Sequence, residues 1–191
     1  MSEELIVKAE SGGNIPPHPE DQYAATCIDI IDLGVVETTW QGRTKQQRKI
    51  VLRFFCGEYF YTADGQEKRP LWVDKRLTFS LHEKGAMRPF LESWRGQKFS
   101  DAELHDGFNV AKLYKAPAFI QVEHNVTPER VYANVKTIMK LPKNMEAPGI
   151  PEGYVRVKDR PPKDGDHAPN GFRGGSEPDD DLPFAPLPSW I

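Results

Sequence analysis

Basic and aromatic side chains alternate through the middle of this 191-residue chain, and together they can hold a single strand of nucleic acid. Guanidinium and ammonium groups neutralise phosphates, while Trp, Tyr and Phe rings stack on unpaired bases of any sequence. The candidate binding residues are Trp40, Arg43, Lys45, Arg48, Arg53, Phe55, Trp72, Arg76, Tyr132 and Lys136. For Phe55 and Trp72 the alternative is that the rings belong to a second packed hydrophobic face.

The net charge of -3 is divided unevenly along the chain. Residues 1–22 carry -4 and residues 151–191 carry -3, whereas residues 23–150 hold 19 basic and 15 acidic side chains, a net charge of +4. A basic body between two acidic arms favours a polyanionic partner. Ordinary variation in surface charge is the alternative explanation.

The residue patterns that catalysis requires do not occur in the sequence. The five histidines lack a Cys or carboxylate at the spacing of a metal site, and there is no phosphate-binding glycine loop or nucleophile elbow. Cys27 and Cys56 fall within expected strands, where we expect small, reduced core residues. The consecutive carboxylates Asp179 to Asp181 lack the preorganisation that a divalent ion needs. We therefore expect no enzyme, no metal and no cofactor.

Short strands position the candidate residues. Residues 23–36, 49–56 and 71–81 are rich in β-branched and aromatic residues and predict three strands, with Gly34 at the end of the first or at a bend in it. In the second strand a period of two separates Phe54, which we expect in the core, from Arg53 on the other face.

Helical spacing interrupts the strands after residue 82. Residues 83–95 place Met87, Phe90 and Trp94 on one helical face, and residues 100–103 have the capping-box pattern of a second short helix. Two more strands are expected at 118–124 and 131–139.

This order predicts an all-β protein with a helical insertion. Five strands with helices between the third and the fourth are the order of an OB-fold, a small barrel that binds oligonucleotides on its second and third strands. An SH3-like barrel lacks the long helical insertion, and a sandwich needs more strands.

The chain divides into three regions: a flexible leader at 1–22, the barrel at 23–145, and a disordered linker with an acidic tail at 146–191. Residues 142–191 contain ten of the 17 prolines and six of the 15 glycines, a composition that cannot bury a core. No apolar run is long enough to span a membrane, and the acidic start lacks the features of a signal peptide. We expect a cytoplasmic protein without a membrane partner, and no coiled-coil heptad settles whether it forms a homo-oligomer.

The tail resembles a motif of known proteins. Its stretch Pro178-Asp179-Asp180-Asp181-Leu182-Pro183-Phe184 is similar to the acidic tip of bacterial single-stranded DNA-binding proteins, which recruits replication and repair enzymes. The tip of that family ends at its Phe, whereas this chain continues to Trp190 and Ile191. The resemblance implies a partner-binding tail through Asp179, Asp180, Asp181, Leu182, Pro183 and Phe184, with Trp190 as a further anchor. A solvated run of charge is the alternative.

A second resemblance covers roughly residues 70–145. The segments Leu77 to Lys84, Leu91 to Gly96, Tyr132 to Val135, and the Leu141-Pro142 that follows look like a family of small phage-encoded proteins regarded as single-stranded DNA-binding proteins. In its most distinctive stretch, Ser93 to Gly96, we expect Trp94 to be buried and Arg95 to end the helix.

These expectations combine into one hypothesis. The chain would coat and protect single-stranded DNA during phage replication or recombination, in the host cytoplasm, and would recruit replication or recombination proteins through its tail. The alternative is a protein-protein adaptor of a phage replisome or assembly without nucleic-acid affinity. A third is a nuclease or other enzyme without a recognisable motif.

Overall fold

The computed structural model describes residues 15–40, 43–62, 65–128 and 130–161. Its strands are β1 (Asp21–Trp40), β2 (Arg43–Tyr61), β3 (Lys68–Thr78), β4 (Pro117–Val126) and β5 (Val131–Met139). Its helices are α1 (Met87–Arg95) and α2 (Asp101–Asp106), and two short 3-10 turns are η1 (Val110–Leu113) and η2 (Val157–Asp159).

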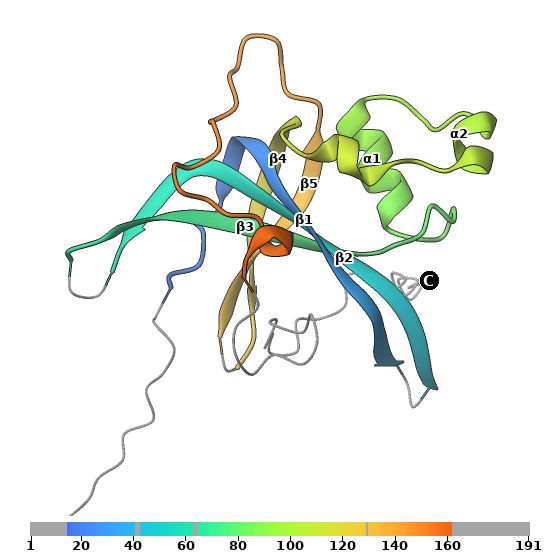
Figure 1. Cartoon of the computed structure of the whole chain (residues 1–191), viewed down its shortest axis with the longest axis horizontal. Coiled ribbons are helices and arrows are strands. Elements are labelled where there is room, and N and C mark those ends of the chain that lie inside the picture. Colours follow the sequence, from blue (N-terminus) through green and yellow to red (C-terminus); the bar gives the residue numbers. More distant parts are fainter. Residues whose placement is uncertain (1–14, 41–42, 63–64, 129, 162–191) are drawn as a thin grey trace, which may run out of the picture.

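The five strands close into a barrel in the order β1-β2-β3-β5-β4 (Figure 1). All neighbouring strands are antiparallel except β3 and β5, which run parallel and pair Asp74 with Asn134. The closed five-stranded barrel expected from the sequence is therefore confirmed. Helix α1 follows β3, and α2 and η1 come next along the chain before β4.

The interior of the barrel is formed by every second residue of its strands. Leu52 and Phe54 of β2 are fully buried, as their period predicted. Helix α1 contributes Trp94, whose ring centroid lies 5.3 Å from that of Phe54. The Trp94 Nε1–H donates to the Pro117 carbonyl at 2.8 Å. Gly96 ends the helix in the left-handed conformation, at φ 68°, which glycine adopts without strain. The expected burial of Trp94 is confirmed.

Strand β1 does not end near Gly34. It pairs with β2 as far as Trp40 beside Arg43, and Gly34 lies instead at a register shift, with φ 67°. A bulge of this kind bends a strand and increases its twist without ending it. The two strands therefore form a long ribbon.

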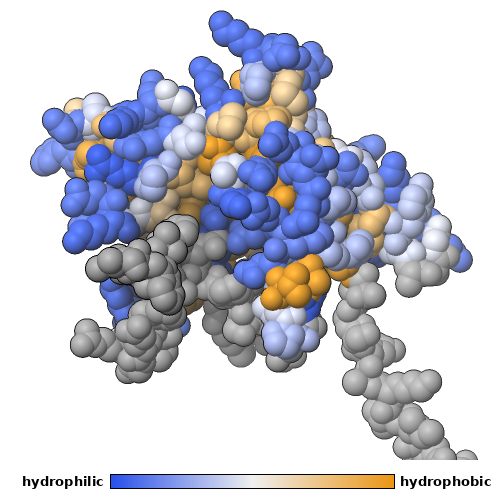
Figure 2. Space-filling view, turned by 180° about the vertical axis from the view of Figure 1, so that it is seen from behind, coloured by the Kyte–Doolittle hydropathy of each residue, from blue (hydrophilic) through white to orange (hydrophobic). Residues whose placement is uncertain are grey.

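The surface seen from behind is hydrophilic over most of its area, and apolar side chains gather toward its centre (Figure 2). Among the residues that the structure describes, no helix is long and apolar enough to cross a membrane.

Residues 148–161, which we call the strap, cross the outer face of β1, β2 and β3 (Figure 1). This segment was expected to be part of a disordered linker, but in the structure it packs on the barrel. Val157 of the strap lies against Ile31, Leu33 and Val51, which form a second hydrophobic cluster outside the barrel interior. These apolar side chains point away from the interior, so their burial requires a cover, and the strap provides it.

Candidate nucleic-acid interface

A row of alternating charges crosses the outer face of the sheet beneath the strap. Asp29 of β1 lies beside Arg53 of β2, and Arg53 lies beside Asp74 of β3. The Arg53 guanidinium donates two hydrogen bonds to the Asp74 carboxylate, at 2.8 and 2.7 Å. A planar guanidinium and a carboxylate make this two-bond contact with defined geometry, so the pair fixes the position of both side chains.

Two members of this row, Arg53 and Asp29, have shifted pKa values. Burial by itself would lower the pKa of Arg53, but the bonds to Asp74 outweigh it and raise the pKa. Burial would raise the pKa of Asp29, but hydrogen bonds from Val157, Arg156 and Tyr154 of the strap hold it below its ordinary value. Arg53 and Asp29 are therefore both charged at neutral pH, although neither is exposed.

A groove of about 710 Å³ lies over the junction of β3 and β5. Its floor is made by Leu71, Trp72 and Asp74 of β3 and by Val131, Tyr132 and Ala133 of β5. Residues 15–18 form one wall, and strap residues 152–155 with 160–161 form another. Segments from both ends of the described chain thus meet at the same groove.

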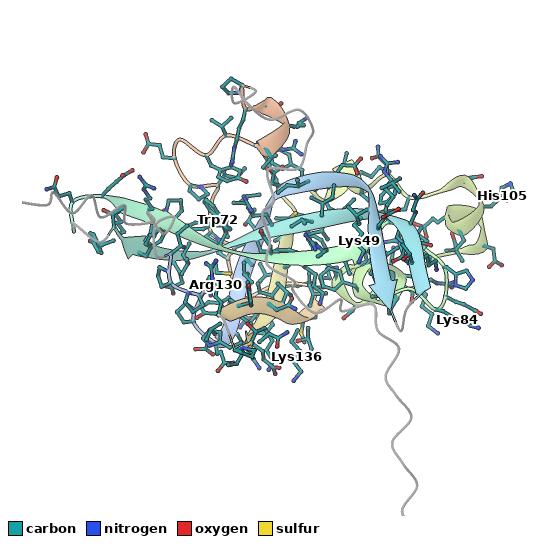
Figure 3. The ribbon with its side chains drawn as sticks, turned by 90° about the horizontal axis from the view of Figure 1, so that it is seen from below. Lys49, Trp72, Lys84, His105, Arg130 and Lys136 are labelled. Carbon is teal, nitrogen blue, oxygen red and sulfur yellow. The ribbon has the colours of Figure 1, made fainter. Side chains whose placement is uncertain are left out.

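Aromatic rings and cations alternate within the groove. The rings of Trp72 and Tyr154 meet edge to face with their centroids 5.9 Å apart. The Arg130 guanidinium lies 5.6 Å from the Tyr132 ring centre, and the Arg160 guanidinium lies 5.9 Å from that of Tyr154. Figure 3 shows Trp72 and Arg130 close to one another, with Lys84 and His105 toward the opposite end of the molecule.

The cations of the groove differ in their ion pairing. Arg69 is paired with Glu67 at 2.7 Å. Arg160 donates to the Val155 carbonyl at 3.1 Å, and within the part of the chain that the structure describes neither Arg160 nor Arg130 pairs with a carboxylate. Two guanidinium groups therefore line the groove without an ion pair to a described carboxylate, and a guanidinium is well suited to bind a phosphate.

Residues 15–18, at the N-terminal wall, are held by a histidine. The His18 ring is 1% exposed and meets the Tyr23 ring edge to face, with centroids 4.7 Å apart. The His18 carbonyl accepts from Nε2 of His124 at 2.8 Å, and the His124 backbone N–H donates to Glu20. Burial lowers the pKa of His18, so its ring is neutral at pH 7.

Two of the ten binding residues predicted from the sequence, Trp72 and Tyr132, lie in the groove. Arg53 and Phe55 are instead 6% and 3% exposed, so neither presents a free surface to a base or a phosphate. The packed alternative for Phe55 describes the structure, in which its ring meets Tyr59 edge to face at 5.4 Å. Arg76 is half-buried on β3.

The remaining predicted residues lie away from the groove. Lys45 and Arg48 are exposed on the β1–β2 ribbon, where Arg48 pairs with Asp32. Lys136 is exposed on β5 and pairs with Glu123. Trp40 and Arg43 end the ribbon, but their side chains are outside the described residues, as are all seven tail residues, which are Asp179, Asp180, Asp181, Leu182, Pro183, Phe184 and Trp190.

Sequence reasoning missed three residues of the groove, Arg130, Tyr154 and Arg160. Arg130 had a local signal, since it stands two positions before Tyr132 and residues at this spacing lie on the same side of a strand. Tyr154 and Arg160 had none, because they lie in a Pro- and Gly-rich stretch whose packing depends on the distant strand β1.

The described residues include no group of three or more His, Cys, Asp or Glu side chains that could hold a metal ion. Burial raises the pKa of both Cys27 and Cys56 to about 12, so their thiols are protonated at neutral pH.

Searches against known protein families and against curated proteins find no match to this chain. The function is therefore argued from the geometry of the groove.

Proposed function

We propose that the barrel is an OB-fold and that the groove over β3 and β5 binds single-stranded nucleic acid. One observation carries this proposal: three rings, Trp72, Tyr132 and Tyr154, share one groove with two guanidinium groups, Arg130 and Arg160, that form no ion pair with a described carboxylate. Stacking surfaces with adjacent cations are what a flexible, unpaired strand needs, because its bases and phosphates are exposed together.

The strand would lie along the β3–β5 junction. Bases stack on Trp72 and Tyr132 on the floor, while Arg130 and Arg160 bind phosphates at the sides. A duplex is excluded from this mode, because its bases are already stacked on one another and cannot also stack on the rings of the groove.

The strand order supports the OB-fold assignment. Order β1-β2-β3-β5-β4 with a helix after β3 is compatible with that barrel, whose known ligand surface includes the second and third strands and the loops beside them. The resemblance of residues 70–145 to phage proteins and that of the tail to the bacterial tip extend the proposal to coating of DNA in phage replication or recombination, with recruitment of partners by the tail.

One observation favours the adaptor as a second candidate. Ile15 and Val155 line the groove and are 48% and 49% exposed, so an apolar peptide would find contacts there as well. The two candidates differ in their dependence on charge, because a strand needs Arg130 and a short apolar peptide does not.

The test is fluorescence anisotropy with labelled oligo(dT), matched oligo(U) and a duplex, measured at several salt concentrations. We expect single strands to bind and the duplex to bind poorly. Arg130→Gln should reduce the slope of log affinity against log salt by about 0.7, the value for one phosphate contact on a single strand. Lys84→Gln removes the same charge from an exposed site outside the groove and is the matched control.

Trp72→Ala should weaken binding by about 1–3 kcal/mol, the range for one base stacked on one ring, while the salt slope stays the same. Equal effects of Arg130→Gln and Lys84→Gln would mean that the groove is not the binding site. An absence of single-strand binding at low salt would contradict the proposal and leave the adaptor.

A further inference from the structure

The strap is anchored by one buried carboxylate, that of Asp29, which is 0% exposed. Its oxygens accept from the Tyr154 hydroxyl at 3.0 Å, the Val157 backbone N–H at 2.8 Å and the Arg156 Nε at 3.2 Å. The Ile30 backbone N–H donates a fourth bond at 2.8 Å. Three of the four donors belong to the strap, so this carboxylate joins the strap to β1.

The same stretch of the strap forms a wall of the groove. Tyr154, which donates to Asp29 through its hydroxyl, presents its ring to Trp72. Arg160 follows a few residues later and lines the groove beside it. One ring and one cation of the candidate binding surface therefore have their positions set by the contact of the strap with β1.

A second contact connects the anchor to the groove floor. The Arg53 guanidinium lies 4.7 Å from the Trp72 ring centre and interacts with the Tyr154 hydroxyl. Arg53 also holds Asp74, which lines the groove. The network contains two carboxylates, Asp29 and Asp74, and two guanidinium groups, Arg53 and Arg156. Its positive and negative charges are equal only while the strap holds Arg156 beside Asp29.

We propose that Asp29 is a positioning residue for ligand binding: it holds the strap so that Tyr154 and Arg160 complete the groove. This inference rests on the proposed function. Asp29 does not touch the ligand, and it acts through the strap. Without the charge of Asp29, Arg156 loses its carboxylate partner, and the strap donors lose a strong acceptor. The strap then no longer holds the Tyr154 ring and the Arg160 guanidinium over β3.

Long-range electrostatics and the positioning role predict opposite signs for one substitution. Asp29→Asn removes a negative charge, and a reduced charge alone would strengthen binding to a polyanion. If Asp29 positions the strap, the same substitution weakens binding. Asp32→Asn is the matched control, because Asp32 lies on the same strand, is exposed, and pairs with Arg48 on the ribbon.

The experiment compares the two full-length variants with the wild-type chain by anisotropy with labelled oligo(dT), below the unfolding transition of each. We expect Asp29→Asn to bind about tenfold more weakly, the effect of losing one or two hydrogen bonds to a charged group. Asp32→Asn should bind as well as the wild type or more tightly. Binding by folded Asp29→Asn that equals that of Asp32→Asn would overturn the inference.

Amide hydrogen exchange supplies a readout besides affinity. In the wild type, oligo(dT) should slow exchange of the backbone N–H groups of 154–157, and in Asp29→Asn these groups should exchange fast without the ligand. Unchanged exchange in Asp29→Asn would also overturn the inference.

If Asp29→Asn does not fold, Tyr154→Phe decides. It keeps the ring but removes the hydroxyl, and with it the bond to Asp29 and the contact with Arg53. We expect binding about two- to threefold weaker, and unchanged affinity would overturn the inference. A wild-type chain that binds no strand contradicts the proposed function itself, whereas equal binding by wild type and variants contradicts only the role of Asp29.

Discussion

The two faces of β2 are buried to a similar degree by different means. On the inner face Leu52 and Phe54 are 0% exposed because the strands of the barrel close around them. On the outer face Arg53 and Phe55 are almost as inaccessible, but Arg53 is covered in part by Tyr154 of the strap, a segment far along the chain. The inner face shows that apolar periodicity predicts burial, and the outer face shows that polarity alone does not predict exposure.

The largest effect should come from the inner face. Phe54→Ala leaves a cavity beside Trp94, and we expect it to lower the free energy of unfolding by about 3–5 kcal/mol. Urea denaturation followed by circular dichroism measures this change. A loss below about 1 kcal/mol would mean that the inner face does not carry the stability of the barrel.

The outer face should respond through its charges. Arg53→Met keeps most of the side-chain volume but leaves Asp74 and Asp29 with one cation fewer. We expect the free energy of unfolding to fall by about 2–3 kcal/mol. This is less than for a fully buried pair, because the Asp74 side chain is 24% exposed. The double variant Arg53→Met/Asp74→Leu removes the unpaired charge on β3 and should recover part of that loss. If the double variant is as unstable as the sum of its single substitutions, the pair is not coupled.

The N-terminal wall should make stability depend on pH. The pKa of His18 is lower in the folded chain than its ordinary value of 6.5, so protons bind preferentially to the unfolded chain. The contribution of His18 to stability is therefore full above pH 6.5 and decreases as the pH falls toward the folded pKa, by about 1.4 kcal/mol for each unit of difference between the two. Thermal unfolding between pH 7.5 and 5 should show this decrease in the wild type and a smaller one in His18→Gln. His82→Gln, at an exposed site, should leave the dependence as it is.

The smallest effect should come from the exposed pair on the ribbon. Arg48 and Asp32 are joined across β1 and β2, as Arg53 and Asp74 are across β2 and β3, but both side chains are about half exposed. Solvent screens such pairs, so Arg48→Gln should leave the melting temperature unchanged within error. A decrease as large as that of Arg53→Met would show that burial does not explain the difference between the two pairs.

The strands were predictable where apolar and polar residues alternate along the sequence, so that one face of the strand is apolar and the other is polar. Residues 131–139 were predicted with the bounds that the structure shows, and the second strand with its correct inner face. Strand β1 was predicted too short, because Gly34 suggests an end when no partner strand is known. Pairing with β2 continues the strand past the glycine.

The candidate site was predictable only in part. Trp72 and Tyr132 stand on strands and were selected for their ring type, and both lie in the groove. The strap was not predictable, because Pro and Gly content is typical of disorder, and the carboxylate to which the strap is hydrogen-bonded, that of Asp29, lies in a distant strand. The amino-acid composition of a segment does not reveal that a residue more than 100 positions away, such as Asp29, will form hydrogen bonds with it.

Strands β3 and β5 meet at the one residue pair Asp74 and Asn134, whereas every other junction of the barrel extends over at least six pairs. Few backbone hydrogen bonds must break for this junction to open, so it is the most compliant part of the barrel wall. Trp72 and Tyr132 lie on its two sides. Under the proposed function, this junction is where the barrel would widen to take purines and pyrimidines of different size, because its other four junctions are held by many more residue pairs.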